Sequence, residues 1–159
     1  MPTIGITGHR ALPPDIARYA RDEIHRVLLR FRPDDLVGLS CLADGADTIF
    51  AEAVREVGGR LVVVVPAAAY RDGLPADHHP TYDRLLAAAT AVRRLPYRDS
   101  TPEAHMAASR LIVDEADELV AVWDGLPARG FGGTADVVAY AREAGTAVTV
   151  IWPSGRTRD

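Results

Sequence analysis

An unbroken apolar run at residues 61–65 constrains the fold more than any other segment of the chain. All five residues are Leu or Val, so a strand formed by them would have no polar face to turn towards water. Such strands are typical of parallel sheets that helices cover on both faces. The run follows two strand–turn–helix patterns, at residues 3–7 with 15–31 and at residues 36–41 with 47–57. We therefore predict a parallel sheet with this strand at or near its centre.

The second half of the chain continues the alternation. Apolar periodicity predicts helices over residues 81–89, 102–116 and 134–143, and strands over residues 91–95, 118–123 and 146–152. Residues 66–80, rich in Gly, Pro, Asp and His, are predicted to form a loop that can act as a lid. The pattern predicts the α/β class, with a single Rossmann-like, doubly wound, mostly parallel sheet flanked by helices over residues 1–153. Residues 154–159 are predicted to be a loose polar tail.

Composition excludes several functional classes. The 159 residues suffice for one domain, and the formal net charge of -4 argues against a general nucleic-acid binder. All 18 basic residues are arginines, so neither the lysine of a Walker-type phosphate loop nor a Schiff-base lysine is present. Cys41 has no cysteine partner, and we see neither a signal peptide nor a membrane span. The expected location is the cytoplasm.

A glycine-rich turn between a predicted strand and a predicted helix is the strongest candidate site. The turn comprises Gly130, Phe131, Gly132, Gly133 and Thr134. Glycines let the backbone approach an anion, and the first turn of a helix presents unpaired N–H groups, so a phosphate is the expected occupant. The alternative is a tight turn with Thr134 as the helix N-cap.

Other loops after predicted strands are expected at the same sheet edge, because the carboxyl ends of parallel strands meet there. They contribute the remaining candidate ligand-binding residues, which are Gly8, His9, Arg10, Ser40, Ala43, Asp44, Gly45, Asp47 and Pro66. Arg10 offers bidentate bonds to a phosphate, and the two aspartates offer bonds to a ribose. The alternatives are a solvated arginine and aspartates that only cap a helix.

Asp124 and Asp136 flank the glycine-rich turn and are the candidate catalytic residues if the chain is an enzyme, since a carboxylate there can stabilise an oxocarbenium-like transition state. Either can instead serve as a charge at the start of the helix. Cys41 is expected to be a buried, unreactive thiol, and His78 with His79 a surface pair. No third metal ligand stands at a recognised spacing, so we predict no metal and no cofactor.

Three segments together, residues 4–10, 38–47 and 117–139, resemble the SLOG superfamily, which includes the lonely-guy phosphoribohydrolases and the DNA-processing protein DprA. The resemblance implies a Rossmann-like fold, a nucleotide-related ligand over the strand ends and commonly a homodimer formed through helices. The lonely-guy signature has a catalytic glutamate where this chain has Val137, and its catalytic arginine aligns near Ala108, with Arg110 two residues away. The resemblance therefore does not carry the hydrolase mechanism to this chain.

The sequence leaves three functional hypotheses. The first is a module that binds or senses a nucleotide or nucleotide-derived phosphate, with the amides of Gly132, Gly133 and Thr134 on the phosphate. The second is a hydrolase or transferase acting at the N-glycosidic bond of nucleoside 5′-monophosphates. The third is a DprA-like DNA-associated protein, which the acidic charge and the absence of lysine weaken.

Overall fold

The computed structural model describes residues 2–158, within which the chain forms six strands, five α-helices and three short 3₁₀ helices. Met1 and Asp159, which the predicted domain and tail include, lie outside the described residues. In chain order the elements are β1 (Thr3–Gly8), α1 (Pro14–Leu28), η1 (Pro33–Asp35), β2 (Val37–Ser40), α2 (Ala46–Glu56), β3 (Arg60–Ala67), η2 (Arg71–Gly73), η3 (Ala76–His78), α3 (His79–Ala88), β4 (Ala91–Tyr97), α4 (Pro102–Glu115), β5 (Glu118–Val122), α5 (Thr134–Glu143) and β6 (Ala147–Ile151).

The strands form one sheet in the order β4-β3-β2-β1-β5-β6, and every neighbouring pair is parallel. The chain moves outward from β1 through β2 and β3 to β4, and then crosses back to β5 on the other side of β1. This arrangement confirms the predicted doubly wound α/β fold, and the apolar run lies inside β3, an internal strand. Loops leave β1 and β5 in opposite directions, and in such sheets this is where ligands bind.

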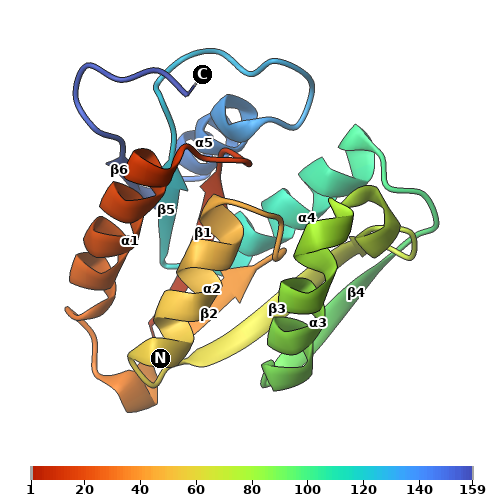
Figure 1. The fold of residues 1–159 in the computed structure, drawn as a ribbon, viewed down its shortest axis with the longest axis horizontal. Coiled ribbons are helices and arrows are strands. Elements are labelled where there is room, and N and C mark those ends of the chain that lie inside the picture. Colours follow the sequence, from red (N-terminus) through yellow and green to blue (C-terminus); the bar gives the residue numbers. More distant parts are fainter. Residues whose placement is uncertain (1, 159) are drawn as a thin grey trace.

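Helices cover both faces of the sheet (Figure 1). Contacts join α1 with α2 and α2 with α3 on one face, and α4 with α5 on the other. Small residues let the helices approach closely: a Cβ atom added at Gly38 of β2 would lie 2.5 Å from the Val54 side chain of α2. The core between the layers is almost wholly aliphatic, with Phe50 as its largest fully buried side chain. No helix within residues 2–158 is long and apolar enough to cross a membrane.

Residues 66–80 are more regular than the predicted loop. Strand β3 includes Pro66 and ends at Ala67, and two 3₁₀ helices lead into α3. The prediction of a surface histidine pair is wrong for His78, which is buried. Its Nε2 atom lies 2.9 Å from the carbonyl oxygen of Leu42, so the ring fastens this segment to the loop after β2.

The segment after β6 is not the loose tail that its polar composition predicts. The Trp152 indole N–H donates to the carbonyl of Arg156, and Arg156 forms an ion pair with Asp15 of α1. Arg158 then lies against His9 and Asp124. In Figure 1 this segment passes over the edge at which β1 and β5 end. The cause is a set of specific polar contacts, which composition alone does not reveal.

Candidate functional site

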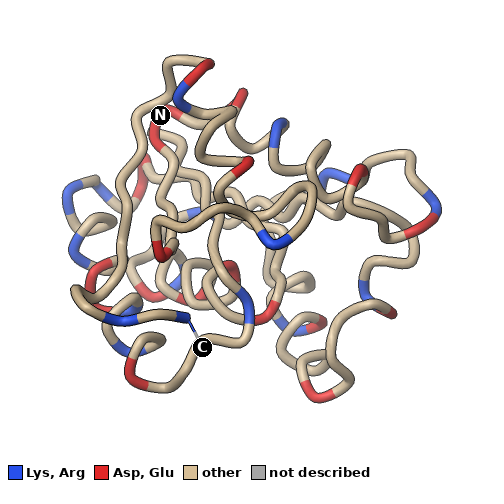
Figure 2. The backbone as a smooth tube through the Cα atoms, turned by 90° about the horizontal axis from the view of Figure 1, so that it is seen from above, with Lys and Arg blue, Asp and Glu red and all other residues tan. Residues whose placement is uncertain are grey.

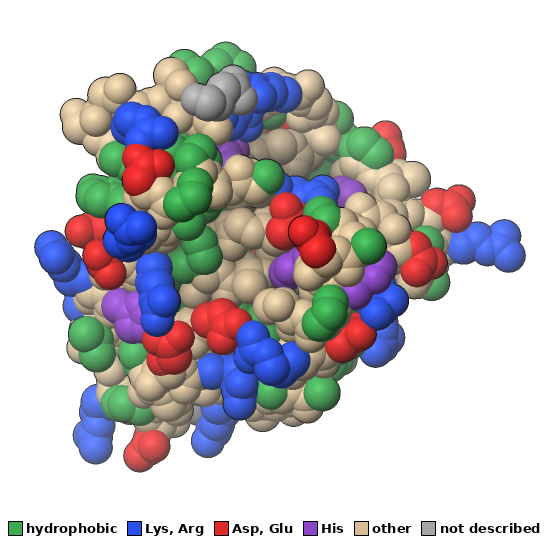
Figure 3. All heavy atoms as spheres, viewed as in Figure 1, with side chains coloured by type: hydrophobic (Ala, Val, Ile, Leu, Met, Phe, Trp, Pro, Cys, Tyr) green, Lys and Arg blue, Asp and Glu red, His purple; other side chains and the backbone are tan. Residues whose placement is uncertain are grey.

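A cleft of about 680 Å³ lies at the carboxyl ends of the strands, between the loops after β1, β2, β3 and β5 and the first half of α4. Figure 3 shows the hollow, with arginine, acidic and histidine side chains at its margin. Its size is within the range of sites for small-molecule ligands. Ten of the predicted ligand-binding residues line it, namely Gly8, His9, Arg10, Ala43, Asp47, Pro66, Gly130, Gly132, Gly133 and Thr134.

The other predicted residues lie behind the lining. Ser40 is fully buried, and its hydroxyl donates to the carbonyl of Asp47 and accepts from the amide of Leu42, which shapes the loop after β2. Asp44 pairs with Arg10, and Gly45 adopts φ +92° where a Cβ atom would lie 2.6 Å from the carbonyl oxygen of His9. Gly45 therefore permits close contact between the loops after β1 and β2.

His9 is a buried junction of the site. Its Nε2 atom lies 3.2 Å from Asp124 Oδ1, and its Nδ1 atom lies 3.0 Å from Arg158 and 3.4 Å from the hydroxyl of Thr134. Burial lowers the pKa of His9, outweighing the hydrogen bond with Asp124 that raises it. A guanidinium can only donate, so the contact with Arg158 requires an unprotonated Nδ1. The backbone amide of Asp124 donates to the Nε2 atom at 3.1 Å, so Asp124 holds one side of the ring and Arg158 the other.

The glycine-rich turn is held partly by its own residues. The amide of Gly132 donates to Asp136 Oδ2 at 2.9 Å, and the amide of Gly133 donates to the carbonyl of Gly130. Gly133, and not Thr134, is the N-cap residue of α5, so the alternative of a threonine cap is wrong. Among residues 2–158 we find no hydrogen-bond partner for the Thr134 amide. Gly132, Gly133 and Thr134 line the cleft, so the positive end of α5 lies at its wall.

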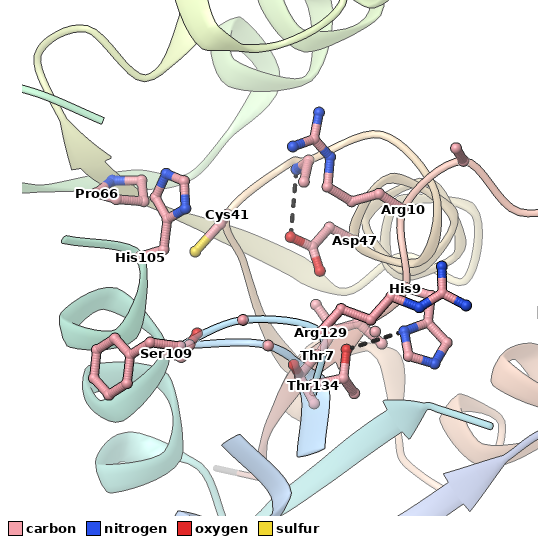
Figure 4. Close-up of a pocket in the computed structure, with 18 of the residues that line it drawn as sticks. Thr7, His9, Arg10, Cys41, Asp47, Pro66, His105, Ser109, Arg129 and Thr134 are labelled. Carbon is pink, nitrogen blue, oxygen red and sulfur yellow. Dashed lines mark hydrogen bonds between the residues drawn. The ribbon is translucent and has the colours of Figure 1, made fainter. Parts of the chain in front are cut away.

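Arginines supply the positive charge of the cleft. Arg10, Arg129 and Arg158 all line it, from three separate segments of the chain. Arg10 donates to Asp44 at 2.8 Å with about half of its side chain exposed, which leaves its terminal nitrogens towards solvent. Figure 4 shows Arg129 and His9 beside Thr134, with Arg10 on the opposite side of the opening. This arrangement can hold an anionic group.

Asp47 is the acidic side chain among the described lining residues. It stands in the first turn of α2, where Oδ2 accepts from the amide of Ala43 at 3.3 Å. Burial raises the pKa of Asp47 to about 7, although the Ala43 hydrogen bond and Arg10 act in the opposite direction. The carboxyl group can therefore exchange a proton close to neutral pH.

Helix α4 and the residues after β3 form the far wall of the cleft. His105 Nε2 hydrogen-bonds the hydroxyl of Ser100 at 2.7 Å, and its ring meets Tyr70 edge to face at 5.6 Å. Burial, and then the charge of Arg10, lower the pKa of His105. Cys41 is buried as predicted, and burial raises the pKa of its thiol, although its sulfur lies on the cleft wall. The thiol form is therefore the one that meets a ligand.

Neither candidate catalytic aspartate lines the cleft. The Asp124 carboxylate is almost wholly buried, lies 3.2 Å from His9 Nε2 and accepts from the amide of Leu126. Asp136 accepts from the amide of Gly132, so it stabilises the start of α5. Both carboxylates position the loop after β5 in this structure. Among the described residues no group of His, Cys, Asp and Glu could hold a metal ion.

The two residues that the sequence resemblance aligns with the lonely-guy catalytic pair lie in the packed interior. Val137 and Ala108 are buried, and neither carries a titratable group. The Arg110 guanidinium lies 5.5 Å from the centre of the Tyr140 ring, where α4 meets α5. Arg110 is not among the residues that line the cleft.

Several residues that line the cleft are not among the site residues predicted from the sequence. They are Tyr70, His105, Ser109, Arg129 and Arg158, together with the Cys41 thiol. Tyr70 lies in the predicted loop after the strand at residues 61–65, and His105 and Ser109 lie inside the predicted helix 102–116. Only the packing of α4 against β3 shows that their side chains reach the cleft. Arg129 precedes the glycine-rich turn by one residue, so a prediction that extended the turn by one position would have included it.

No family model matches the chain. No curated protein matches it either. Several solved structures do match the chain. DprA from Streptococcus pneumoniae is 20% identical with a TM-score of 0.71, and the match covers 98% of this chain and 52% of that one. DprA from Helicobacter pylori is 16% identical with a TM-score of 0.71, covering 99% of this chain and 68% of that one.

A third similar structure is the molybdenum cofactor binding protein from Rippkaea orientalis, which is 17% identical with a TM-score of 0.62 and is matched over 94% of this chain and 75% of that one. These likenesses show the fold alone: the chain forms a Rossmann-like α/β domain similar to the domains of these proteins. The chain spans about half the length of the Streptococcus protein.

Proposed function

We propose that the chain binds a nucleotide or a nucleotide-derived phosphate ligand in the cleft above β1, β2 and β5. The observation that carries the proposal is the convergence of Arg10, Arg129, Arg158 and the start of α5 on one cleft of about 680 Å³. Guanidinium groups and helix N-termini are both suited to phosphate. The molybdenum cofactor binding protein, which has a similar fold, is named for binding a small molecule and gives further support.

Thermal unfolding in the presence of candidate ligands tests the proposal. The panel comprises nucleoside 5′-monophosphates, cyclic nucleotides, ADP-ribose and ribose 5-phosphate. A ligand at a hundred times its dissociation constant stabilises the folded state by about 2.7 kcal/mol. Arg129→Gln is expected to reduce the shift, whereas Arg55→Gln, an equal loss of charge on an exposed residue outside the cleft, leaves it unchanged. No shift with any phosphate compound would contradict the proposal.

Binding without cleavage fits the placement of the carboxylates better than hydrolysis does. Asp124 and Asp136 hold the loop after β5, and Val137 stands at the family's glutamate position. We therefore expect no free base when the protein is incubated with nucleoside 5′-monophosphates and the mixture is separated by chromatography. Release of base that Asp136→Asn or Asp124→Asn abolishes would establish the hydrolase alternative.

Single-stranded DNA is a second candidate ligand, because both DprA structures align over almost the whole of this chain and the Helicobacter protein is described as binding single-stranded DNA. Fluorescence anisotropy with a labelled oligonucleotide tests it. The nucleotide proposal predicts that a mononucleotide binds the cleft at salt concentrations where the oligonucleotide does not. Tight oligonucleotide binding that Arg10→Gln and Arg129→Gln abolish together would favour DNA.

The proposal includes a homodimer, which the resemblance to the superfamily implies. Large apolar side chains remain exposed on α1 and β4, among them Tyr19, Val92 and Tyr97. Sedimentation velocity should give a mass about twice the 17.1 kDa of the chain. A single species of 17.1 kDa at micromolar concentration would contradict the dimer and leave the ligand proposal standing.

A further inference from the structure

The cleft combines charges of opposite sign. Arg10, Arg129 and Arg158 line it together with the carboxyl group of Asp47. A carboxylate inside a site for an anion weakens binding of that anion, because like charges repel strongly where water is excluded. The ligand therefore has to offer Asp47 hydrogen-bond donors at a point away from its phosphate.

The Asp47 carboxyl group has acceptor capacity to spare. Its Oδ2 atom accepts from the amide of Ala43, and within residues 2–158 no donor is seen on Oδ1. Figure 4 shows the group at the centre of the cleft wall, between Arg10 and the sulfur of Cys41. An ionised carboxylate only accepts hydrogen bonds, through two oxygens with about four lone pairs. A planar group with two adjacent N–H donors matches it.

The loop that presents Asp47 is strained and firmly held. Leu42 adopts φ +60°, a left-handed conformation that is rare for a bulky residue, although its side chain is fully buried. The Ser40 hydroxyl accepts from the Leu42 amide, His78 bonds the Leu42 carbonyl, and the Thr48 hydroxyl donates to the carbonyl of Ala43 at 2.7 Å. Such strain persists only where the surroundings fix it, and it concentrates at binding sites. Asp47 is thus preorganised.

One small ligand can reach both ends of the cleft. The amide of Ala46, next to Asp47, donates to the carbonyl of His9 at 3.2 Å, and the His9 ring lies 3.4 Å from the hydroxyl of Thr134 at the start of α5. A single residue, His9, therefore separates the Asp47 end from the phosphate end. A nucleoside monophosphate carries its phosphate and its base at opposite ends of a ribose.

We infer that the Asp47 carboxylate accepts hydrogen bonds from the base of the bound nucleotide. It thereby selects a base with a guanine-type edge, in which a ring N–H and an exocyclic amino group are adjacent donors. This inference rests on the proposed function and adds the class of ligand to it. Guanine offers N1–H and its 2-amino group to the two carboxylate oxygens. Hypoxanthine lacks the amino group, and adenine presents an acceptor at N1, which would face a carboxylate oxygen. A site built to pair such donors rejects analogues that lack them.

Isothermal titration calorimetry at pH 8 with GMP, IMP, AMP and ribose 5-phosphate tests the inference. In the wild-type protein, GMP should bind about tenfold or more tightly than IMP or AMP, since bonds to a charged acceptor are strong. Asp47→Asn should bring GMP to the affinity of IMP and leave ribose 5-phosphate unchanged. Asp22→Asn, a matched change on an exposed residue of α1 that does not line the cleft, should preserve the ratio of GMP to IMP.

Each alternative result has a distinct meaning. Equal wild-type affinities for GMP, IMP and AMP overturn the inference, and this comparison stands even where Asp47→Asn fails to fold. An equal loss of ribose 5-phosphate and GMP binding in Asp47→Asn overturns it as well, because Asp47 would then act on the sugar or on the fold. Failure of the wild-type protein to bind ribose 5-phosphate and every nucleotide overturns the proposed function itself.

Discussion

At the scale of single residues, the site contains ionisable groups whose pKa values are shifted by burial. His9 is neutral because burial lowers its pKa, and the neutral ring accepts a hydrogen bond from Arg158. The Arg158 Nε atom and Asp124 Oδ2 are buried, 3.6 Å apart and without hydrogen bonds among the described residues. Asp124 and His9 thus hold the Arg158 side chain in place, and the residue also lines the cleft, where its charge can attract an anionic ligand.

Arg158→Gln is therefore expected to weaken binding of a phosphate ligand. Loss of a charge-assisted hydrogen bond from a partly exposed group corresponds to about 1 kcal/mol, or roughly a fivefold rise in the dissociation constant. Calorimetry on the variant and on Arg55→Gln, whose charge lies outside the cleft, separates this contact from a general loss of positive charge. Equal affinities in the wild type and Arg158→Gln would mean that the segment after β6 serves only the fold.

Asp47 should make stability depend on pH. Its pKa in the folded protein is about 7, above the ordinary value of 3.8, so the folded state keeps a proton that the unfolded chain has already lost. Stability is therefore lost as the pH rises between these values. An asparagine side chain does not titrate, so Asp47→Asn should be more stable than the wild type by about 1 to 3 kcal/mol at pH 8, and by little at pH 4.

Urea unfolding of both proteins at the two pH values measures the effect. Cys41, Tyr70, Asp44 and Arg10 are the charged or titratable groups that act on Asp47 or are acted on by it, and all of them are present in both proteins. The difference between the two proteins therefore isolates Asp47. The same difference at both pH values would show that Asp47 titrates normally.

At the scale of elements, periodicity in the sequence predicts every strand and α-helix in the right order. Helix α5 has the predicted bounds, and α4 begins as predicted, with the Thr101 hydroxyl accepting from the amide of Ala104. The sequence does not predict the regular structure within residues 66–80, because three-residue 3₁₀ helices are too short to produce a detectable apolar period. The sequence does not predict the ordered path of the segment after β6, because that path depends on a few long-range polar contacts. Polar residues after the last element ordinarily indicate a loose loop.

The glycine-rich turn gives a test at this scale. Gly132 adopts φ +82°, and a Cβ atom there would lie 3.0 Å from the carbonyl oxygen of Pro102, so Gly132→Ala should cost about 1 to 3 kcal/mol of stability. Gly130, two residues earlier, has open space around an added Cβ atom and no positive φ. Gly130→Ala should change stability by less than about 0.5 kcal/mol. If both variants lose the same free energy of unfolding in urea, the positive φ of Gly132 is not the cause of the loss.

At the scale of the whole molecule, acidic and basic residues are interspersed around the chain in the view onto the strand ends, and the formal net charge is -4 (Figure 2). The positive charge that matters is local, in the arginines of the cleft. Sequence reasoning placed the strand-end loops together because parallel topology requires it. The sequence does not show that Arg158 and residues of α4 line the cleft, because their positions depend on how the helices and the last segment pack against the folded sheet.

The charge distribution predicts how binding responds to salt. A ligand with one phosphate releases few counterions, whereas a single-stranded oligonucleotide held at several phosphates loses affinity with a slope of about -0.7 per phosphate in a plot of log affinity against log salt. Between 50 and 200 mM salt, about the range over which such slopes are measured, affinity for a mononucleotide should fall only a few-fold, because the net charge of -4 offers a longer polyanion no extended basic path. Titrations across this range check the slope. An oligonucleotide bound with a steep slope, and more tightly than any mononucleotide, would mean that the arginines form part of a longer nucleic-acid track.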